Sequence, residues 1–494
     1  MFKKVTHAVD GNVTEVISKT GVSVGAPGKY SEQPGVLTFR GDPLRQNAAV
    51  GVAKVMNGKL KQIRSVRTQV LDEGNSGFGY GSQPVIIKWY KNIREIMGLN
   101  QDAKATTGLK EAIMPSDDGR IYFFDMDTQG YSRAPINIGM PMSVTASINP
   151  FGYPLLYVGQ SVEKLKHYTG NVGLRIVDLI KNEVIGFQTG LTTLSKGKSN
   201  EVFSSPLISS DTDTAIYTGG NGMLYEVDLN TVFNMQIPAI SVQPSASTYG
   251  YTSAQKKTSI GNHTSVAAYG NYAYFGDDSG LLQCVDMNTM TCIWARDLGD
   301  SIMACTAIEI EADGTVALYA GTVCNLTGKG RQLELLKINA LTGADIWSVK
   351  TPYKAKFSSK AQKVGSYAGL MASPLIGKGD ISDLVIFNTN MMEVDKNTNC
   401  AVVFALDKST GEVVWEELLD ATSESSPILI LDETGKSFIV VGDDNGILRL
   451  MDGFTGATMD SVSMKSPIKS SPAAYGNHII VGTTGAQVYF VDIE

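Results

Sequence analysis

Residues 274–294 read YFGDDSGLLQCVDMNTMTCIW, and this stretch decides the fold. An apolar run ends at Gly276, the turn Asp277-Asp278-Ser279-Gly280 reverses the chain, and a second apolar run, 281–285, returns along it. Short apolar runs separated by Gly, Asp and Asn turns are typical of a β-meander. Because the same Gly-Asp-Asp-x-Gly turn recurs at 442–446, a repeat architecture is the first hypothesis.

Two signals recur along the chain and each occurs eight times. The first is a stretch rich in Ser, Thr or Ala, often ending in Pro, at the start of an inner strand: Gln83-Pro84, Val144 to Ser147, Ser204-Ser205-Pro206, Thr264-Ser265-Val266, Cys305-Thr306-Ala307, Ala372-Ser373-Pro374, Ser425-Ser426-Pro427 and Ser470-Ser471-Pro472. The second is an Asp or Asn that ends a later strand: Asp125, Asp178, Asp228, Asp286, Asn339, Asp407, Asp452 and Asp492.

A repeat unit of this length holds about four strands, which is the size of a propeller blade. We therefore expect an all-β, eight-bladed β-propeller of four-stranded antiparallel blades. The last unit has only three strands, so Leu60 to Val70 is expected to supply its fourth strand and close the ring. Residues 1–35 are expected to form a tail or strap, and 36–494 a single propeller domain. The blades are expected at about 84–140, 141–190, 200–245, 260–300, 301–352, 366–420, 421–464, and 466–494 closed by 36–70.

Composition excludes several classes of protein. The chain has 494 residues, 43% of them apolar, with 51 glycines and 17 prolines, which suits many short strands joined by tight turns. A net charge of −7 with scattered basic residues gives no footprint for nucleic acid. The five cysteines form no CxxC pair and are expected to be buried apolar residues. The basic N-terminus is followed at once by Asp10-Gly11-Asn12, so neither a signal-type apolar core nor a transmembrane segment is predicted.

The turn at 407–415, Asp-Lys-Ser-Thr-Gly-Glu-Val-Val-Trp, resembles the repeat of the pyrroloquinoline-quinone (PQQ) family of propellers, whose signature is Asp-x-x-Thr-Gly-x-x-x-Trp. Weaker copies occur at 340–347 and 286–294, and 452–456 keeps the turn without the Trp. The resemblance covers roughly residues 36–494 and implies the quinoprotein-like propeller fold. We expect Trp294, Trp347 and Trp415 to be structural, covering the gap between adjacent blades.

The resemblance also raises the alternative of a quinone-dependent dehydrogenase, or another propeller enzyme that uses the central channel. Quinone catalysis needs calcium ligands, a carboxylate base, cations around an anionic cofactor and, in alcohol-oxidising members, an adjacent Cys-Cys pair. The sequence has no Cys-Cys dipeptide, and small neutral residues dominate the expected channel. No cofactor is therefore predicted, PQQ with calcium is not favoured, and no catalytic or metal-binding residue is assigned. The pairs Asp277-Asp278 and Asp443-Asp444 are interpreted as solvated turns.

The favoured function is a non-catalytic binding scaffold that presents rim loops to a protein, peptide or glycan. The resemblance alone places it at the cell envelope or outside the cytoplasm, with the cytoplasm as the alternative. Long insertions are expected at 88–110, 161–172, 242–262, 324–332 and 352–366, with helical turns in 90–105. Arg40-Gly41-Asp42 is interpreted as a turn. The candidate channel or rim binding positions are Tyr80, Gln83, Gln160, Ser205, Asn221, Thr264, Ser373, Ser426 and Ser471.

Overall fold

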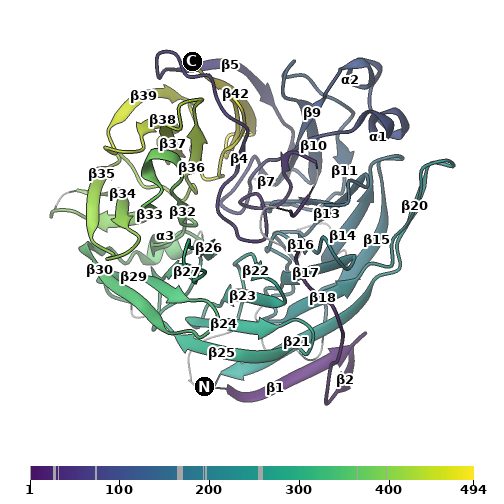
Figure 1. Cartoon of the computed structure of the whole chain (residues 1–494), viewed down its shortest axis with the longest axis horizontal. Coiled ribbons are helices and arrows are strands. Elements are labelled where there is room, and N and C mark those ends of the chain that lie inside the picture. Colours follow the sequence, from purple (N-terminus) through teal and green to yellow (C-terminus); the bar gives the residue numbers. More distant parts are fainter. Residues whose placement is uncertain are drawn as a thin grey trace.

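Antiparallel sheets surround a common centre in the computed structural model (Figure 1). The structure describes residues 2–494 except 26–28, 32, 73–74, 164–170, 193, 195–196, 198, 254–259, 327, 364 and 397. The predicted all-β class is confirmed, because strands make up nearly all of the regular structure.

The stretch at 274–294 folds as the predicted meander. Strands β22 (Ala267–Tyr269), β23 (Tyr272–Gly276), β24 (Leu281–Asp286) and β25 (Thr291–Asp297) pair in that order. The Asp277 carboxylate makes the first turn, since its Oδ1 accepts hydrogen bonds from the backbone N–H groups of Ser279 at 2.9 Å and Leu281 at 2.8 Å. A short acidic side chain is therefore a local requirement of this turn.

The other sheets repeat this order of an inner strand followed by strands progressively farther from the centre. Their strands are β8 (Val85–Lys88), β9 (Lys110–Pro115), β10 (Arg120–Asp125) and β11 (Ile136–Asn137); β12 (Ser147–Ile148), β13 (Leu155–Val158), β14 (Gly173–Asp178) and β15 (Glu183–Thr189); β16 (Leu207–Ile208), β17 (Thr214–Thr218), β18 (Leu224–Asp228) and β21 (Ser245–Ser253); β26 (Ala307–Ile310), β27 (Val316–Gly321), β29 (Arg331–Asn339) and β30 (Asp345–Ala355); β32 (Leu375–Ile376), β33 (Leu384–Glu393), β34 (Asn399–Asp407) and β35 (Val413–Leu418); β36 (Ile428–Leu431), β37 (Ser437–Gly442), β38 (Ile447–Asp452) and β39 (Thr458–Ser463); and β40 (Ala473–Tyr475), β41 (His478–Thr483) and β42 (Gln487–Ile493).

Shorter elements lie between and beside these sheets. They are β3 (Gly35–Val36), β4 (Ala49–Val50), β6 (Val70–Asp72), β7 (Asn75–Ser76), β28 (Val323–Cys324), β31 (Ala368–Gly369), the hairpin of β19 (Val232–Asn234) and β20 (Ala239–Ser241), the helices α1 (Lys91–Ile96), α2 (Gln101–Ala105) and α3 (Ser359–Gln362), and a 3-10 turn at Gly379–Ile381. The helical turns predicted in 90–105 are confirmed, with Ile93 and Met97 buried.

Strand β5 (Leu60–Arg67) pairs antiparallel with β42 over the whole length of β5, so an N-terminal strand forms the outer edge of the C-terminal sheet. In Figure 1 this dark strand lies beside the yellow C-terminal strand. The lack of a fourth strand in the last repeat unit predicted this pairing.

The first residues of the chain add two strands to another sheet. Strand β1 (Phe2–Val9) pairs antiparallel with β21, and β2 (Asn12–Thr14) pairs with β1. The chain then runs past Lys19, whose ammonium group contacts the carboxylates of Glu226 and Asp228, each at 2.7 Å. Part of the expected tail or strap is thus regular β-structure.

Residues 37–48, which we call the axial segment, line the inside of the ring. Their backbone oxygens accept hydrogen bonds from the inner strands of several sheets: Ile148 N–H donates to Leu37, Ala268 N–H to Pro43, Ile308 N–H to Leu44 and Ala474 N–H to Ala48. The Asn47 amide exchanges two hydrogen bonds with the backbone of Leu429, as a paired strand would. One short segment therefore contacts inner strands on all sides of the centre.

Two arginines anchor the axial segment, and both are fully buried. Arg45 donates to the carbonyls of Val266 at 2.8 Å and Phe39 at 2.6 Å, and Arg40 donates to the carbonyl of Pro427 at 2.6 Å. The Arg40-Gly41-Asp42 turn is confirmed by the hydrogen bond from Gly41 N–H to the Thr38 carbonyl at 2.9 Å. Its Arg40 side chain is enclosed, so it cannot reach an external partner.

The repeat tryptophans pack between neighbouring sheets, as predicted. Each indole N–H donates to a carbonyl of the next sheet: Trp294 to Ala340, Trp347 to Lys408 and Trp415 to Gly453. Each ring also lies against the glycine of the next Thr-Gly turn, namely Gly343, Gly411 and Gly456. The repeat signature thus encodes the contact between one sheet and the next. The cysteines are buried as expected, except Cys292, which is partly exposed.

Candidate functional site

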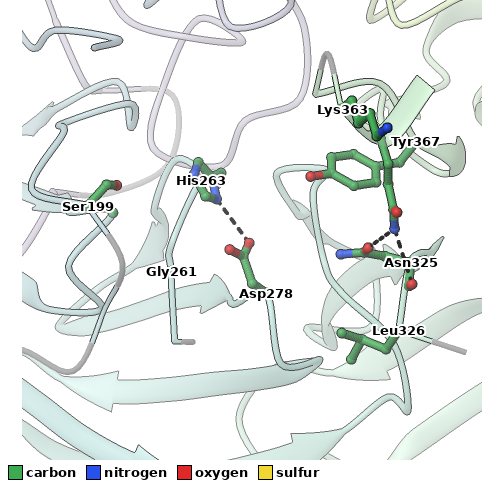
Figure 2. Close-up of a pocket in the computed structure, with 10 residues that line it drawn as sticks. Ser199, Gly261, His263, Asp278, Asn325, Leu326, Lys363 and Tyr367 are labelled. Atoms are coloured by element: carbon green, nitrogen blue, oxygen red, sulfur yellow. Dashed lines mark hydrogen bonds and ion pairs between the residues drawn. The ribbon is translucent and has the colours of Figure 1, made fainter. Parts of the chain in front are cut away.

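A polar pocket opens on the face of the ring at which the inner strands begin, which we call the upper face. Its cavity volume is about 570 Å³, and we call it the His263 pocket. It spans loops of four successive sheets and is lined by Ser199, Gly220, Gly261, His263, Asp278, Asn325, Leu326, Gln362, Lys363 and Tyr367. Figure 2 shows the side chains converging from both sides of the opening.

A His-Asp pair forms one wall of the pocket. His263 lies just before β22 and Asp278 lies in the β23–β24 turn, and the His263 Nδ1 is 2.9 Å from the Asp278 Oδ1. Burial opposes the charged imidazolium, but the charge and the hydrogen bond of Asp278 outweigh it and raise the pKa of His263. The pair is partly open to solvent, with side-chain exposures of 27% and 22%.

The interpretation of both Asp pairs as solvated turns is wrong for their first members. Asp277 and Asp443 are fully buried, because their carboxylates accept the backbone N–H groups of their own turns. Only the second member of each pair faces the upper surface, where Asp278 meets His263 and Asp444 accepts from the Thr422 hydroxyl. The repeated turn therefore presents one carboxylate and buries the other.

We expect Asp278→Asn to lower the pKa of His263, because burial remains while the compensating negative charge is lost. A histidine with a raised pKa stabilises the fold below the unfolded pKa of about 6.5, and this contribution is lost as pH rises through the folded pKa. The stability advantage of the parent protein over the variant should therefore be largest at acidic pH. NMR titration of the His263 ring and denaturation at several pH values would measure both effects. Asp444→Asn should leave the His263 titration unchanged, and an unaltered pKa in Asp278→Asn would contradict the assigned pairing.

An amide pair forms the opposite wall. Gln362 Nε2 donates to the Asn325 backbone carbonyl at 3.2 Å and also contacts its Oδ1, while Asn325 Nδ2 donates to the Ser301 hydroxyl at 2.9 Å. The Asp300 carboxylate accepts the backbone N–H groups of Asn325 and Leu326, which holds this loop in place. Both amides are therefore oriented before any ligand binds.

Aromatic rings lie beside these walls. The Tyr367 ring projects into the pocket with its hydroxyl directed toward the His263 side (Figure 2). Burial and then the nearby Asp278 charge raise the pKa of Tyr367, so its hydroxyl remains protonated. Phe203 packs edge-on against His263 at 6.0 Å and stacks with Tyr80 at 6.5 Å between ring centroids.

Tyr80 closes the centre of the upper face. It comes from the loop before β8, and its hydroxyl contacts the backbone carbonyls of Met303 at 2.6 Å and Met371 at 2.8 Å. These two residues precede β26 and β32, which lie across the ring from the β9–β10 sheet (Figure 1). Tyr80 therefore bridges the ring above the axial segment.

The other eight predicted positions are each at most 3% exposed. Their side chains hold the ring together: Gln83 accepts from the Arg40 N–H, Gln160 from Arg175, and the hydroxyls of Ser426 and Ser471 accept the N–H of Ser373 and Ser426 on the preceding sheets. Asn221, Thr264 and Ser205 likewise bond within the protein, at Gly190, Gly276 and Phe39. Small hydroxyl residues recur at the inner strands because they link one sheet to the next.

Two of the predicted positions are adjacent in sequence to residues that line the pocket. Asn221 follows Gly220 and Thr264 follows His263, and these two neighbours line the pocket. The residue before the repeated Ser or Thr pair is Phe203, His263, Glu424 or Lys469, and this position could have pointed to His263, which lines the pocket. Of the predicted insertions, 161–172, 242–262, 324–332 and 352–366 each include residues outside the described part of the chain.

No three His, Cys, Asp or Glu side chains in the described part of the chain are grouped to hold a metal ion. Within the same residues, no helix is long and apolar enough to cross a bilayer.

Residues 399–494 match the family model described as outer membrane protein assembly factor BamB. Among solved structures, BamB from Moraxella catarrhalis is 15% identical, with a TM-score of 0.50 over 88% of this chain and 99% of that chain. Quinohemoprotein alcohol dehydrogenases from Pseudomonas putida and Comamonas testosteroni are each 11% identical over 93% of this chain and 80% of theirs, with TM-scores of 0.60 and 0.61. No curated protein matches the sequence. The likenesses show the β-propeller fold, and together with the family match they confirm the resemblance of this chain to the PQQ-like repeat family.

Proposed function

We propose that the chain is a non-catalytic binding propeller of the cell envelope that presents its rim insertions to a protein partner. In this proposal the ring has eight four-stranded blades and is closed by β5 on the C-terminal sheet. The pairing of β5 with β42 supports the closure. The match to a BamB model over 399–494 supports the envelope location and the protein partner.

The filled centre of the ring carries the proposal. A quinone cofactor would need open space near the centre, cations for its carboxylates and oxygen ligands for calcium. Here the axial segment occupies the inside of the ring, and the guanidinium groups of Arg40 and Arg45 are engaged with backbone carbonyls. Tyr80 bridges the upper end, and Glu424 is paired with Lys469 at 2.9 Å. The residues present do not fit PQQ with calcium.

Two insertions offer a surface for a protein partner on the lower face, which is opposite the His263 pocket. Helix α1 connects β8 to β9, and the β19–β20 hairpin connects β18 to β21. Because successive connections in an antiparallel sheet alternate between its two ends, both insertions lie at the opposite end of the sheets from the β23–β24 turn and its counterparts. They meet where Asn92 Nδ2 lies 3.4 Å from Met235 Sδ, and Phe233 packs on Tyr153 with ring centroids 5.0 Å apart. The hairpin exposes 65% of Val232 and 73% of Ile237. Exposed apolar side chains on structured insertions favour recognition of a protein.

We expect PQQ with Ca²⁺ to leave the melting temperature of the purified protein unchanged and to support no dye reduction with alcohols or aldoses. A ligand that binds only the folded state must raise stability by mass action, so thermal melting tests binding independently of turnover. PQQ is the cofactor to test because the fold is similar to that of quinohemoprotein alcohol dehydrogenases. A saturable rise in melting temperature together with turnover would overturn the non-catalytic proposal.

The partner surface is tested by photo-crosslinking in the native cell. A crosslinking residue at Ile237 should yield a specific protein adduct, whereas one at exposed Phe454, in the β38–β39 turn, should not. With the crosslinking residue kept at position 237, Val232→Ser should lower the yield of the adduct without changing the melting temperature, since the Val232 side chain is solvent-exposed. Adducts of equal yield at both positions would contradict a specific surface on the hairpin.

A further inference from the structure

We propose that the His263 pocket binds a neutral saccharide of one or two sugar rings. This site is separate from the protein-binding surface of the proposed function, because it lies on the opposite face of the ring. The inference rests on the charge, the donor and acceptor pattern, the aromatic wall and the size of the pocket.

The charges that line the pocket nearly balance. Lys363 and Asp278 are its oppositely charged lining residues, and Asp278 is also engaged by His263. A phosphate or a polycarboxylate would lie close to the Asp278 carboxylate, whose negative charge repels an anion at short range. The lining therefore suits a ligand that carries hydroxyl groups rather than net charge.

The pocket offers hydrogen-bond donors and acceptors side by side. Lys363 and the Tyr367 hydroxyl supply donors, while the Gln362 Oε1 and the Asp278 carboxylate supply acceptors. Each hydroxyl of a sugar both donates and accepts, so this mixture matches a polyol. Gln362 is fixed by Asn325, and His263 is fixed by Asp278, so binding requires little further ordering of these side chains.

Two glycines line the pocket beside the Asp278 and Ser199 side chains. A Cβ at Gly261 would lie 2.6 Å from the Asp278 Oδ2, and a Cβ at Gly220 would lie 2.4 Å from the Ser199 Oγ. Any larger residue at either position would crowd the polar atoms that line the cavity. Glycine thus leaves the Asp278 oxygen and the Ser199 hydroxyl accessible to a ligand.

The shape of the pocket also fits a sugar ring. Tyr367 projects an aromatic ring into a cavity of about 570 Å³, which lies within the usual range of small-molecule sites (Figure 2). The apolar face of a pyranose can pack on such a ring while its hydroxyls reach the polar walls. A mono- or disaccharide satisfies both surfaces at once.

The test uses the full chain with cellobiose, maltose and chitobiose as probes, followed by saturation-transfer NMR at millimolar concentrations. We expect at least one disaccharide to bind, and we expect Tyr367→Ala and Gln362→Ala to weaken it at least tenfold. Lys363→Ala provides a third variant that cannot disturb the core, because Lys363 is exposed. Phe454→Ala removes an exposed aromatic ring outside the pocket and should leave binding unchanged.

Two acidic compounds test whether the pocket prefers neutral saccharides or anions. Cellobionate and a tripeptide with a free carboxyl terminus should bind more weakly than the neutral disaccharide. Tighter binding of either acid would overturn the saccharide assignment in favour of an anion site. Failure of all three disaccharides, or binding that survives Tyr367→Ala, Gln362→Ala and Lys363→Ala, would also overturn it. Photo-crosslinking at Ile237 does not depend on any of these outcomes, so failure here leaves the protein-partner proposal separately testable.

Discussion

Replacing Arg45 with Met should destabilise the protein by about 3 kcal/mol or more, because several buried carbonyls lose their donor at once. Arg45 is fully enclosed, and a methionine of similar length cannot donate to Val266, Phe39 or Ser205. Each buried acceptor left without a partner costs about 1–3 kcal/mol. Denaturant unfolding followed by tryptophan fluorescence would measure the loss.

Arg64→Met provides the matched control for Arg45→Met. Arg64 lies on the exposed outer strand β5, where substitutions usually change stability by no more than about 0.5 kcal/mol. If both variants unfolded at the same denaturant concentration as the parent, the axial segment would not be a structural part of the ring.

The second large effect is expected at Gly456, where Ala should destabilise the protein by about 2–4 kcal/mol. Gly456 has φ +76°, and a Cβ there would lie 2.4 Å from the Trp415 ring. The left-handed backbone alone costs a non-glycine residue about 1–2 kcal/mol, so the remainder is expected from displacing Trp415. Urea denaturation would give the total.

A matched glycine and a double mutant separate the two causes. Gly435 has φ +84° but no atom within 4 Å of its Cβ position, so Gly435→Ala should show the backbone cost alone. In a Trp415→Ala background the Gly456→Ala penalty should fall to that smaller value, since the ring it displaces is gone. An equal penalty in both backgrounds would contradict the packing role assigned to the repeat signature.

Local signals in the sequence predicted those parts of the fold that local chemistry determines. The Asp-x-x-Thr-Gly-x-x-x-Trp signature predicted the contact of Trp347 with the next sheet, and the lack of a fourth strand in 466–494 predicted the pairing of β5. The axial segment was not predicted, because 37–48 has no periodicity. Its partners, such as Val266 and Pro427, are backbone carbonyls just before the inner strands β22 and β36, and only the arrangement of the sheets around a common centre brings them within reach of Arg45 and Arg40.

The candidate site could not be predicted from the sequence either, because its residues come together only in the folded chain. His263 and Asp278 are separated in sequence by a strand and a turn, and Gln362 and Tyr367 come from a loop two sheets farther along. A solvated turn was a reasonable interpretation of Asp277-Asp278, because acidic turns are usually exposed. The buried hydrogen bonds of Asp277 leave Asp278 as the member that faces the pocket. Residue pattern alone could not distinguish the two carboxylates.

The pairing of β5 with β42 also governs how this chain can fold while it is being synthesised. Lys61 and Glu494, which bond across this edge, are 433 positions apart, and the axial segment likewise needs partners near residue 474. A ribosome makes the N-terminal strand long before its partner exists, so β5 must remain unpaired through most of translation. Such distant contacts slow folding and expose strand edges to aggregation. We therefore expect β5 to be the last strand to reach its final contacts, and the nascent chain to depend on protection of that edge until β42 emerges.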